Sequence, residues 1–181
     1  MPTLPAVRAW RAPLAIALVV VAIDQLTKHW AVTSLGTDRE IELFWTLQLN
    51  LGFNNGMAFG QGQGFGPLIG VVATLVIVYL LVTLRSESTP MSTVGIGLLI
   101  GGAAGNLIDR MFRGDDGFLQ GAVVDFIDLQ WFPIFNVADM AINVGAGLLI
   151  LNSILSARAQ RRVESAADAE PVEGDAIGDQ R

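Results

Sequence analysis

Three aspartates stand among large apolar side chains in one short stretch of the chain, residues 121–139. They are Asp125, Asp128 and Asp139, and their neighbours include Val, Ile, Phe and Trp. An ionised carboxylate loses most of its hydration in such surroundings, so each acid needs a partner, a proton or a chemical role. Two of them could divide acid–base work, because one carboxylate can take a proton from water while the other, protonated, polarises a peptide carbonyl.

The chain offers few other catalytic groups. It has no cysteine and one histidine, His29, which excludes thiol nucleophiles and disfavours a zinc or iron site made only of protein ligands. A Ser–Lys dyad would have to use Lys28, the only lysine, and no serine is well placed beside it in the sequence. We therefore expect aspartate chemistry, with no metal and no cofactor.

The composition is that of a membrane protein. Hydrophobic residues make up 52% of the 181 residues and charged residues 15%, against about 25% in an average soluble domain. The net charge of −6 comes mostly from residues 163–181, an acidic and alanine-rich tail that we expect to be disordered and cytoplasmic. The basic cluster Arg158, Arg161 and Arg162 is too small to suggest nucleic-acid binding.

The apolar segments predict a mainly α-helical membrane fold with four transmembrane helices in a single domain, residues 1–162. Arg8 and Arg11 before the first segment resemble the start of a secretory signal peptide. The apolar character returns three more times downstream, so we interpret the first segment as a span. The four spans are expected at about residues 12–31, 67–84, 91–109 and 134–156.

The segment between the first two spans has a different pattern. Residues 40–51 alternate polar and apolar side chains except at Phe44, which predicts a half-buried strand. We therefore expect a small extracytoplasmic β-sheet at about residues 38–60, and an extracytoplasmic loop between spans three and four. Basic residues are more numerous on the side of the two termini, six against four, so both termini are expected in the cytoplasm.

This topology brings polar residues from distant parts of the chain to the outer face. Each has a structural explanation of its own: Asp24 and Lys28 fit a helical i, i+4 pair, and Asn54 begins a turn. Asp109 and Arg110 fit the charges of a helix end, yet their collection on one face favours a shared site. The gathered residues are Asp24, Asn54, Asn106, Asp109, Arg110, Asp125, Asn136 and Asp139.

Four sequence blocks in order resemble lipoprotein signal peptidase, or signal peptidase II, a family of bacterial intramembrane aspartyl peptidases. The blocks are Asp24-Gln-Leu-Thr-Lys28, Asn54-Asn-Gly-Met-Ala-Phe59, Gly105-Asn-Leu-Ile-Asp-Arg110, and Val124-Asp-Phe126 with Phe135-Asn-Val-Ala-Asp139. The resemblance covers about residues 14–156 and implies that Asp125 and Asp139 are the catalytic pair. It also implies binding or supporting roles for Asp24, Asn54, Gly56, Asn106, Asp109, Arg110 and Asn136, whereas Asp128 has no counterpart and is expected to be structural.

The resemblance further implies a substrate and a location. The substrate would be a prolipoprotein with diacylglyceryl on the cysteine just after the cleaved bond, processed at the outer face of the bacterial inner membrane among membrane lipid. Inhibition by a globomycin-type peptide is expected. Three features depart from the family pattern: Met57 stands where a small residue is common, Gly60 stands where serine is common, and the turn at residues 114–120 is somewhat long. Of these, Met57 is expected to alter the shape of the substrate groove.

Two other classes of protein fit part of the pattern. A small proton-coupled carrier would also place carboxylates in a membrane, but here the polar residues gather at one face. A non-catalytic assembly factor would leave that gathering unexplained. Within the peptidase hypothesis, we expect Asn54 and Arg110 to position substrate or partner carboxylates. Replacing either by alanine should slow cleavage without changing the pH optimum, because neither side chain titrates usefully.

Overall fold

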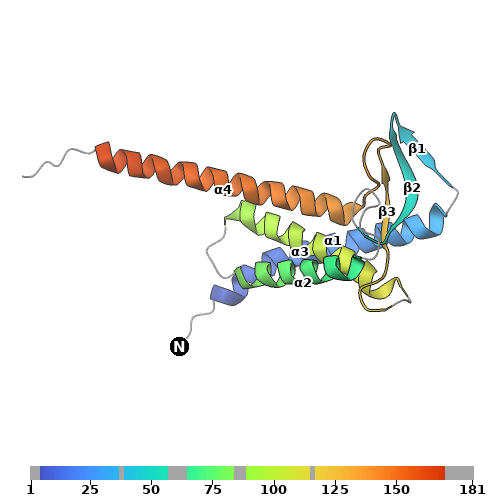
Figure 1. The fold of residues 1–181 in the computed structure, drawn as a ribbon. Coiled ribbons are helices and arrows are strands. Elements are labelled where there is room, and N and C mark those ends of the chain that lie inside the picture. Colours follow the sequence, from blue (N-terminus) through green and yellow to red (C-terminus); the bar gives the residue numbers. More distant parts are fainter. Residues whose placement is uncertain (1–4, 37–38, 57–64, 84–88, 115–116, 170–181) are drawn as a thin grey trace, which may run out of the picture.

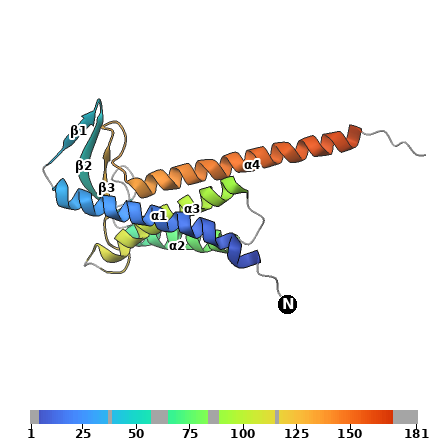
Figure 2. The same ribbon diagram turned by 180° about the vertical axis from the view of Figure 1, so that it is seen from behind.

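The computed structural model describes residues 5–36, 39–56, 65–83, 89–114 and 117–169. Four helices run roughly along one direction, and a small sheet lies across one end of them (Figures 1 and 2). Met57 and Gly60 lie outside the described residues. The elements in chain order are α1 (Pro5–Ser34), β1 (Ile41–Phe44), β2 (Leu47–Asn54), α2 (Gly66–Thr83), α3 (Pro90–Phe112), β3 (Val123–Asp128) and α4 (Val137–Ala169).

The helices confirm the expected membrane fold. Among the described residues, Trp10–Ser34, Pro90–Phe112 and Val137–Ser165 are long and apolar enough to cross a membrane, and Gly66–Val82 is a shorter apolar helix. About 20 residues of helix span a bilayer core. The chain is therefore a multi-pass membrane protein.

Helix α4 differs from its expected limits at both ends. It begins at Val137 and continues to Ala169, so residues 163–169, expected to be disordered, are helical. Extending an existing helix avoids the cost of nucleation, and alanine and glutamate favour the helical state. The rest of the expected tail, residues 170–181, lies outside the described residues.

The sheet contains a strand, β3, that the sequence pattern did not predict, and a turn at Trp45 and Thr46 divides the strand expected over residues 40–51 into β1 and β2. Its order is β1-β2-β3 with antiparallel pairing, and β3 comes from the connection between α3 and α4, where we expected a loop. The strand is buried at nearly every position, so the alternation that marks a half-buried strand is missing. Pairing of Gly52 with Asp125 and of Asn54 with Val123 places the first aspartate of the pair on β3.

Glycines on α3 allow α1 and α4 to pack closely against it. A Cβ atom on Gly101 would lie 2.7 Å from the Cβ atom of Val20, and one on Gly105 would lie 2.5 Å from Oδ2 of Asp24. Small residues promote this kind of approach between membrane helices. Here they bring the polar end of α3 against those of α1 and α4.

We predict that Gly105→Ala lowers the free energy of unfolding by about 1–3 kcal/mol, because the new methyl group must displace the Asp24 carboxylate. Gly147→Ala on α4 is the matched control, since a Cβ atom there meets nothing within 4 Å. The control should be neutral or stabilise by up to about 1 kcal/mol through helix propensity. Thermal unfolding in detergent measures both variants, and equal melting temperatures would contradict the packing argument.

Candidate active site

Asn136 connects the two aspartates. Its side-chain Nδ2 donates a hydrogen bond to Oδ1 of Asp125 at 2.6 Å, and its backbone N–H donates to Oδ2 of Asp139 at 3.2 Å. Asp125 lies on β3 and Asp139 in the first turn of α4. One fully buried amide residue thus links the strand and the helix that carry the two acids.

The same residue explains why α4 begins where it does. Oδ1 of Asn136 accepts a hydrogen bond from the backbone N–H of Asp139 at 3.0 Å, while the Asp139 carboxylate accepts from the backbone N–H of Asn136. This reciprocal pair is a capping box, which satisfies N–H groups that a helix start leaves without partners. The cap places the Asp139 carboxylate at the N-terminal end of α4.

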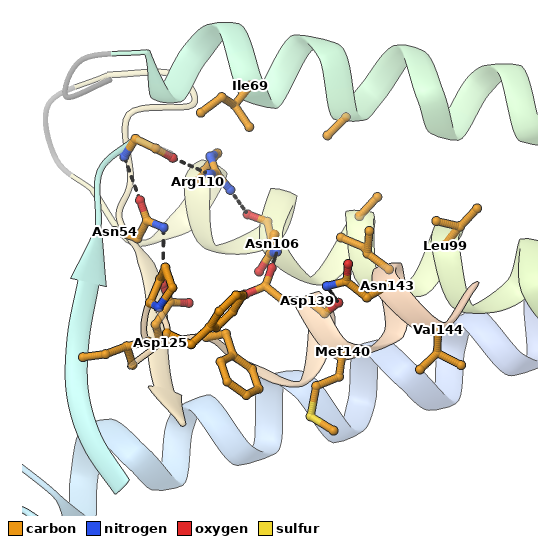
Figure 3. Close-up of a pocket in the computed structure, with 18 of the residues that line it drawn as sticks. Asn54, Ile69, Leu99, Asn106, Arg110, Asp125, Asp139, Met140, Asn143 and Val144 are labelled. Carbon is orange, nitrogen blue, oxygen red and sulfur yellow. Dashed lines mark hydrogen bonds between the residues drawn. The ribbon is translucent and has the colours of Figure 1, made fainter. Parts of the chain in front are cut away.

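Each aspartate also accepts a hydrogen bond from a second amide. Nδ2 of Asn54, at the end of β2, donates to Oδ2 of Asp125 at 3.3 Å, and Nδ2 of Asn106 on α3 donates to Oδ1 of Asp139 at 2.8 Å (Figure 3). The contact of Asn54 with a partner carboxylate agrees with the positioning role expected from sequence. The same hydrogen bond also lowers the pKa of Asp125, an effect that the expectation of an unchanged pH optimum did not include.

The pKa of Asp125 is raised to about 7. Burial is the largest cause, and the negative charge of Asp139 adds to it, while hydrogen bonds from Asn136 and Asn54 act in the opposite direction. Only 4% of Asp125 is exposed, and loss of hydration disfavours the ionised carboxylate. Asp125 can thus hold a proton near neutral pH.

Arg110 and Gly56 form the wall of the site next to Asn54. The guanidinium donates to the backbone carbonyls of Asn106 and Gly56, each at 3.3 Å, and Gly56 N–H donates to Oδ1 of Asn54 at 3.0 Å. Among the described residues, Nε of Arg110 is buried without a hydrogen-bond partner. Arg110 therefore ties the segment after β2 to α3, while its Nε–H makes no hydrogen bond within the part of the chain that the structure describes.

Lys28 lies at the centre of a buried ionic cluster beside the aspartate pair. Its Nζ atom lies 2.9 Å from carboxylate oxygens of both Asp24 and Asp109, and it donates to Oδ1 of Asn106 at 2.9 Å. All three ionic side chains are completely buried. The i, i+4 pair expected from sequence is present, and it is one half of a larger cluster that the spacing did not reveal.

The two acids of this cluster hold the backbone on either side of the site. Asp24 accepts a hydrogen bond from the backbone N–H of Ala138 at 2.9 Å, and Asp109 accepts from that of Val124 at 3.2 Å. Ala138 precedes Asp139, and Val124 precedes Asp125. Asp24 and Asp109 thus position the aspartate pair through the main chain.

Asp128 has the structural surroundings that were expected of it. Its carboxylate accepts from Gln48 at 2.8 Å, from Asn50 at 3.5 Å and from the backbone N–H of Gln130 at 2.7 Å. Burial tends to raise the pKa of Asp128, but these hydrogen bonds outweigh it and the net shift is downward. Asp128 fixes the end of β3 to β2.

A cavity of about 910 Å³ opens beside the aspartate pair. Figure 3 shows Asn54, Arg110, Asn106, Asp125 and Asp139 together at one end, with apolar side chains such as Leu99 and Val144 toward the other. The walls come from α2, α3, α4 and residues 129–135. The apolar lining consists of Ile69, Val72, Ala73, Val76, Leu99, Ala103, Leu129, Trp131, Phe132, Pro133, Ile134, Phe135, Met140, Ile142 and Val144.

Fold and site together define a multi-pass membrane protein with a carboxylate pair, one member buried and the other half-buried, at the end of an apolar cavity. The family model described as Signal peptidase (SPase) II, Peptidase_A8, matches residues 16–155. The chain belongs to the signal peptidase II family of aspartic peptidases, which confirms the resemblance found in the sequence.

Individual relatives agree with this membership. Lipoprotein signal peptidase of Rhodococcus jostii is 41% identical over 77% of this chain and 71% of its own length, and that of Shouchella clausii is 40% identical over 81% and 95%. Two solved structures of bacterial membrane enzymes have TM-scores of 0.68 and 0.66, at 28% and 31% identity. They cover 90% and 77% of this chain and 94% and 90% of their own.

We predict that Lys28→Met destabilises the protein by about 3–5 kcal/mol, because two buried carboxylates lose their shared cation. Arg113→Met is the control, because Arg113 pairs with Asp109 at 2.7 Å but is 28% exposed. When Arg113 is replaced, Asp109 still has Lys28 as its cationic partner. The control should lose only about 1 kcal/mol or less. Unfolding in detergent measures both losses, and a larger loss for Arg113→Met would contradict the central position of Lys28.

Proposed function

We propose that the chain removes signal peptides from lipid-modified prolipoproteins by cleaving before the diacylglyceryl-cysteine. The observation that carries the proposal is the pair of aspartates at the polar end of an apolar cavity, Asp125 buried and Asp139 half-buried. Such a cavity suits an apolar peptide and acyl chains, with the scissile bond at the carboxylates. The relatives named lipoprotein signal peptidase support the assignment.

Asp139 is proposed as the base and Asp125 as the acid. Asp139 takes a proton from water as the water oxygen attacks the peptide carbonyl carbon, while Asp125 donates its proton to the carbonyl oxygen. The tetrahedral intermediate then breaks its C–N bond, and the leaving nitrogen takes the proton held by Asp139. The hydroxyl proton of the intermediate returns to Asp125, which restores the pair. The raised pKa of Asp125 supports its role as the acid.

The residues around the pair have supporting roles in this proposal. Asn136, Asn106 and Asn54 orient the carboxylates through the hydrogen bonds described above. Arg110 and Gly56 line the cavity and offer polar contacts to the substrate backbone. Asp24 and Asp109 keep the flanking main chain in place.

The proposed location is the bacterial cytoplasmic membrane. Arg158, Arg161 and Arg162 are exposed on the part of α4 far from the sheet (Figure 1), and the positive-inside rule favours the cytoplasm for such a cluster. Both termini would then be cytoplasmic and the site extracytoplasmic, with membrane lipid around the helices. A globomycin-type peptide is proposed to occupy the cavity and exclude substrate.

Incubation of the purified protein with a lipid-modified prolipoprotein tests the proposed function. Release of a signal peptide supports it, and a substrate without the diacylglyceryl group should be cleaved much more slowly. A carrier or an assembly factor would release no peptide. An intact prolipoprotein after prolonged incubation with the folded, reconstituted protein would contradict the proposal.

We predict that Asp125→Asn and Asp139→Asn each lower turnover by about a thousandfold or more, with the double variant little worse, because the two acids act as a unit. Asp128→Asn, three residues along β3 from Asp125, is the matched control and should cleave within a few-fold of the wild type. Single-turnover cleavage of the same prolipoprotein measures all four variants. Either aspartate variant within tenfold of the wild-type rate would remove that residue from the pair.

We predict that kcat/KM falls as the pH rises through about 7, because Asp125 must be protonated to act as the acid and its pKa is about 7. Asn54→Ala removes a donor that stabilises ionised Asp125, so its pKa should rise and the falling limb should move to higher pH. Asn50→Ala, on the same strand, loses a contact to Asp128 and is the control. A limb that stays in place or moves to lower pH in Asn54→Ala would contradict this assignment.

A further inference from the structure

The tip of the β1–β2 hairpin carries three consecutive apolar side chains that pack against little of the protein. Leu43 is 54% exposed, Phe44 79% and Trp45 90%. Exposed apolar residues that occur singly need no explanation, but a contiguous group marks an interaction surface. Strand alternation would point only every second side chain outward, whereas here all three neighbours are exposed.

The backbone conformation at the tip is one that tryptophan rarely adopts. Phe44 pairs with Leu47, so Trp45 and Thr46 form a two-residue loop, and Trp45 has a φ of 53°. Hairpin loops of this length favour glycine or asparagine at positions with positive φ. A bulky residue there is strained, so the fold itself gives no reason for an exposed tryptophan at this position.

The location of the tip relates it to the membrane. In both views the hairpin runs across the helices and projects sideways past α4, at the level of the last turns of α1 (Figures 1 and 2). The span in α1 continues to Ser34, and Trp30 near its end is 42% exposed. Tryptophans concentrate at the boundary between the acyl region and the headgroups. The tip therefore lies level with the end of the span in α1, where this boundary is expected.

Charge is arranged to match this position. Arg39, Glu40 and Glu42 are exposed on the part of the hairpin nearer α1, whereas the tip has no charged residue. A hairpin that is polar at its base and apolar at its tip can insert only the tip.

We propose that Leu43, Phe44 and Trp45 insert into the interfacial region of the outer leaflet of the phospholipid bilayer. The hairpin then anchors the sheet to the lipid surface. Because β2 pairs directly with β3, the anchor holds the strand that carries Asp125 at a fixed height above the acyl chains. The inserted tip would be a second membrane contact, separate from the helices.

Site-directed spin labelling tests the insertion, because a chain without cysteine accepts a single labelled cysteine at any position. A nitroxide at Thr46→Cys is measured in liposomes of phosphatidylcholine and phosphatidylglycerol, with no substrate present. Glu40→Cys, at the polar base of the hairpin, is the matched control. The measured quantity is the ratio of collisions with oxygen to collisions with a water-soluble nickel chelate. This oxygen-to-nickel ratio should be several-fold higher at position 46 than at position 40.

A second measurement adds Phe44→Ser and Trp45→Gly to the Thr46→Cys protein. Glycine accepts a positive φ, so the hairpin should still form, and the oxygen-to-nickel ratio should fall to that of the Glu40→Cys control. A ratio already as low as the control with the natural tip, or one unchanged by the two substitutions, would overturn the proposal. Spin–spin broadening that disappears on dilution with unlabelled protein would overturn it too, since a second copy would then cover the tip. Because the measurement uses no substrate, its outcome is independent of the proposed peptidase activity.

Discussion

The buried ammonium of Lys28 is the interaction on which the architecture of the site depends. A cation without hydration needs acceptors, and it finds them in Asp24, Asp109 and Asn106. Each of the two carboxylates uses another oxygen lone pair to hold a backbone N–H, Ala138 for Asp24 and Val124 for Asp109. These backbone groups immediately precede Asp139 and Asp125. One charge thereby sets the relative positions of α1, α3, β3 and α4, and with them the distance between the two proposed catalytic acids.

The protein surrounds its two kinds of acid in different ways. Asp24 and Asp109, which hold the main chain around the site, are paired with Lys28, whereas Asp125 and Asp139 accept hydrogen bonds from the amides of Asn54, Asn106 and Asn136. A cation in direct contact would strongly favour the ionised form, whereas neutral amides orient a carboxylate with a weaker effect on its charge. Burial and the neighbouring carboxylate can then raise the pKa of Asp125 to about 7. Arg110 donates to two backbone carbonyls, so its positive charge acts on the two aspartates only from a distance.

Sequence patterns predicted the parts of this molecule that arise locally or from composition. The apolar segments predicted the helices, and topology placed the polar residues on one face, where the structure brings them together. The patterns missed β3, because a buried strand has no alternation and its pairing with β2 joins residues about seventy positions apart, such as Asn54 and Val123. They also missed the shared role of Lys28, and they did not identify Asp125 as the carboxylate that Asn54 contacts, since both depend on packing between distant segments. Helix α4 extends past its expected end because helix propensity continues after the apolar residues stop.

The start of α4 shows why an asparagine suits position 136 better than any other capping residue. A helix entering a membrane must satisfy the N–H groups of its first turn within the protein. Serine, aspartate and asparagine can all accept the hydrogen bond from the Asp139 backbone, but ionised aspartate has nothing to donate and serine has a single, shorter donor. Asn136 accepts that hydrogen bond through Oδ1 and donates through Nδ2 to Asp125. Only a side chain with both functions, at this length, can begin the helix and align the acid on the neighbouring strand, so the stability of the fold and the geometry of the site depend on the same amide.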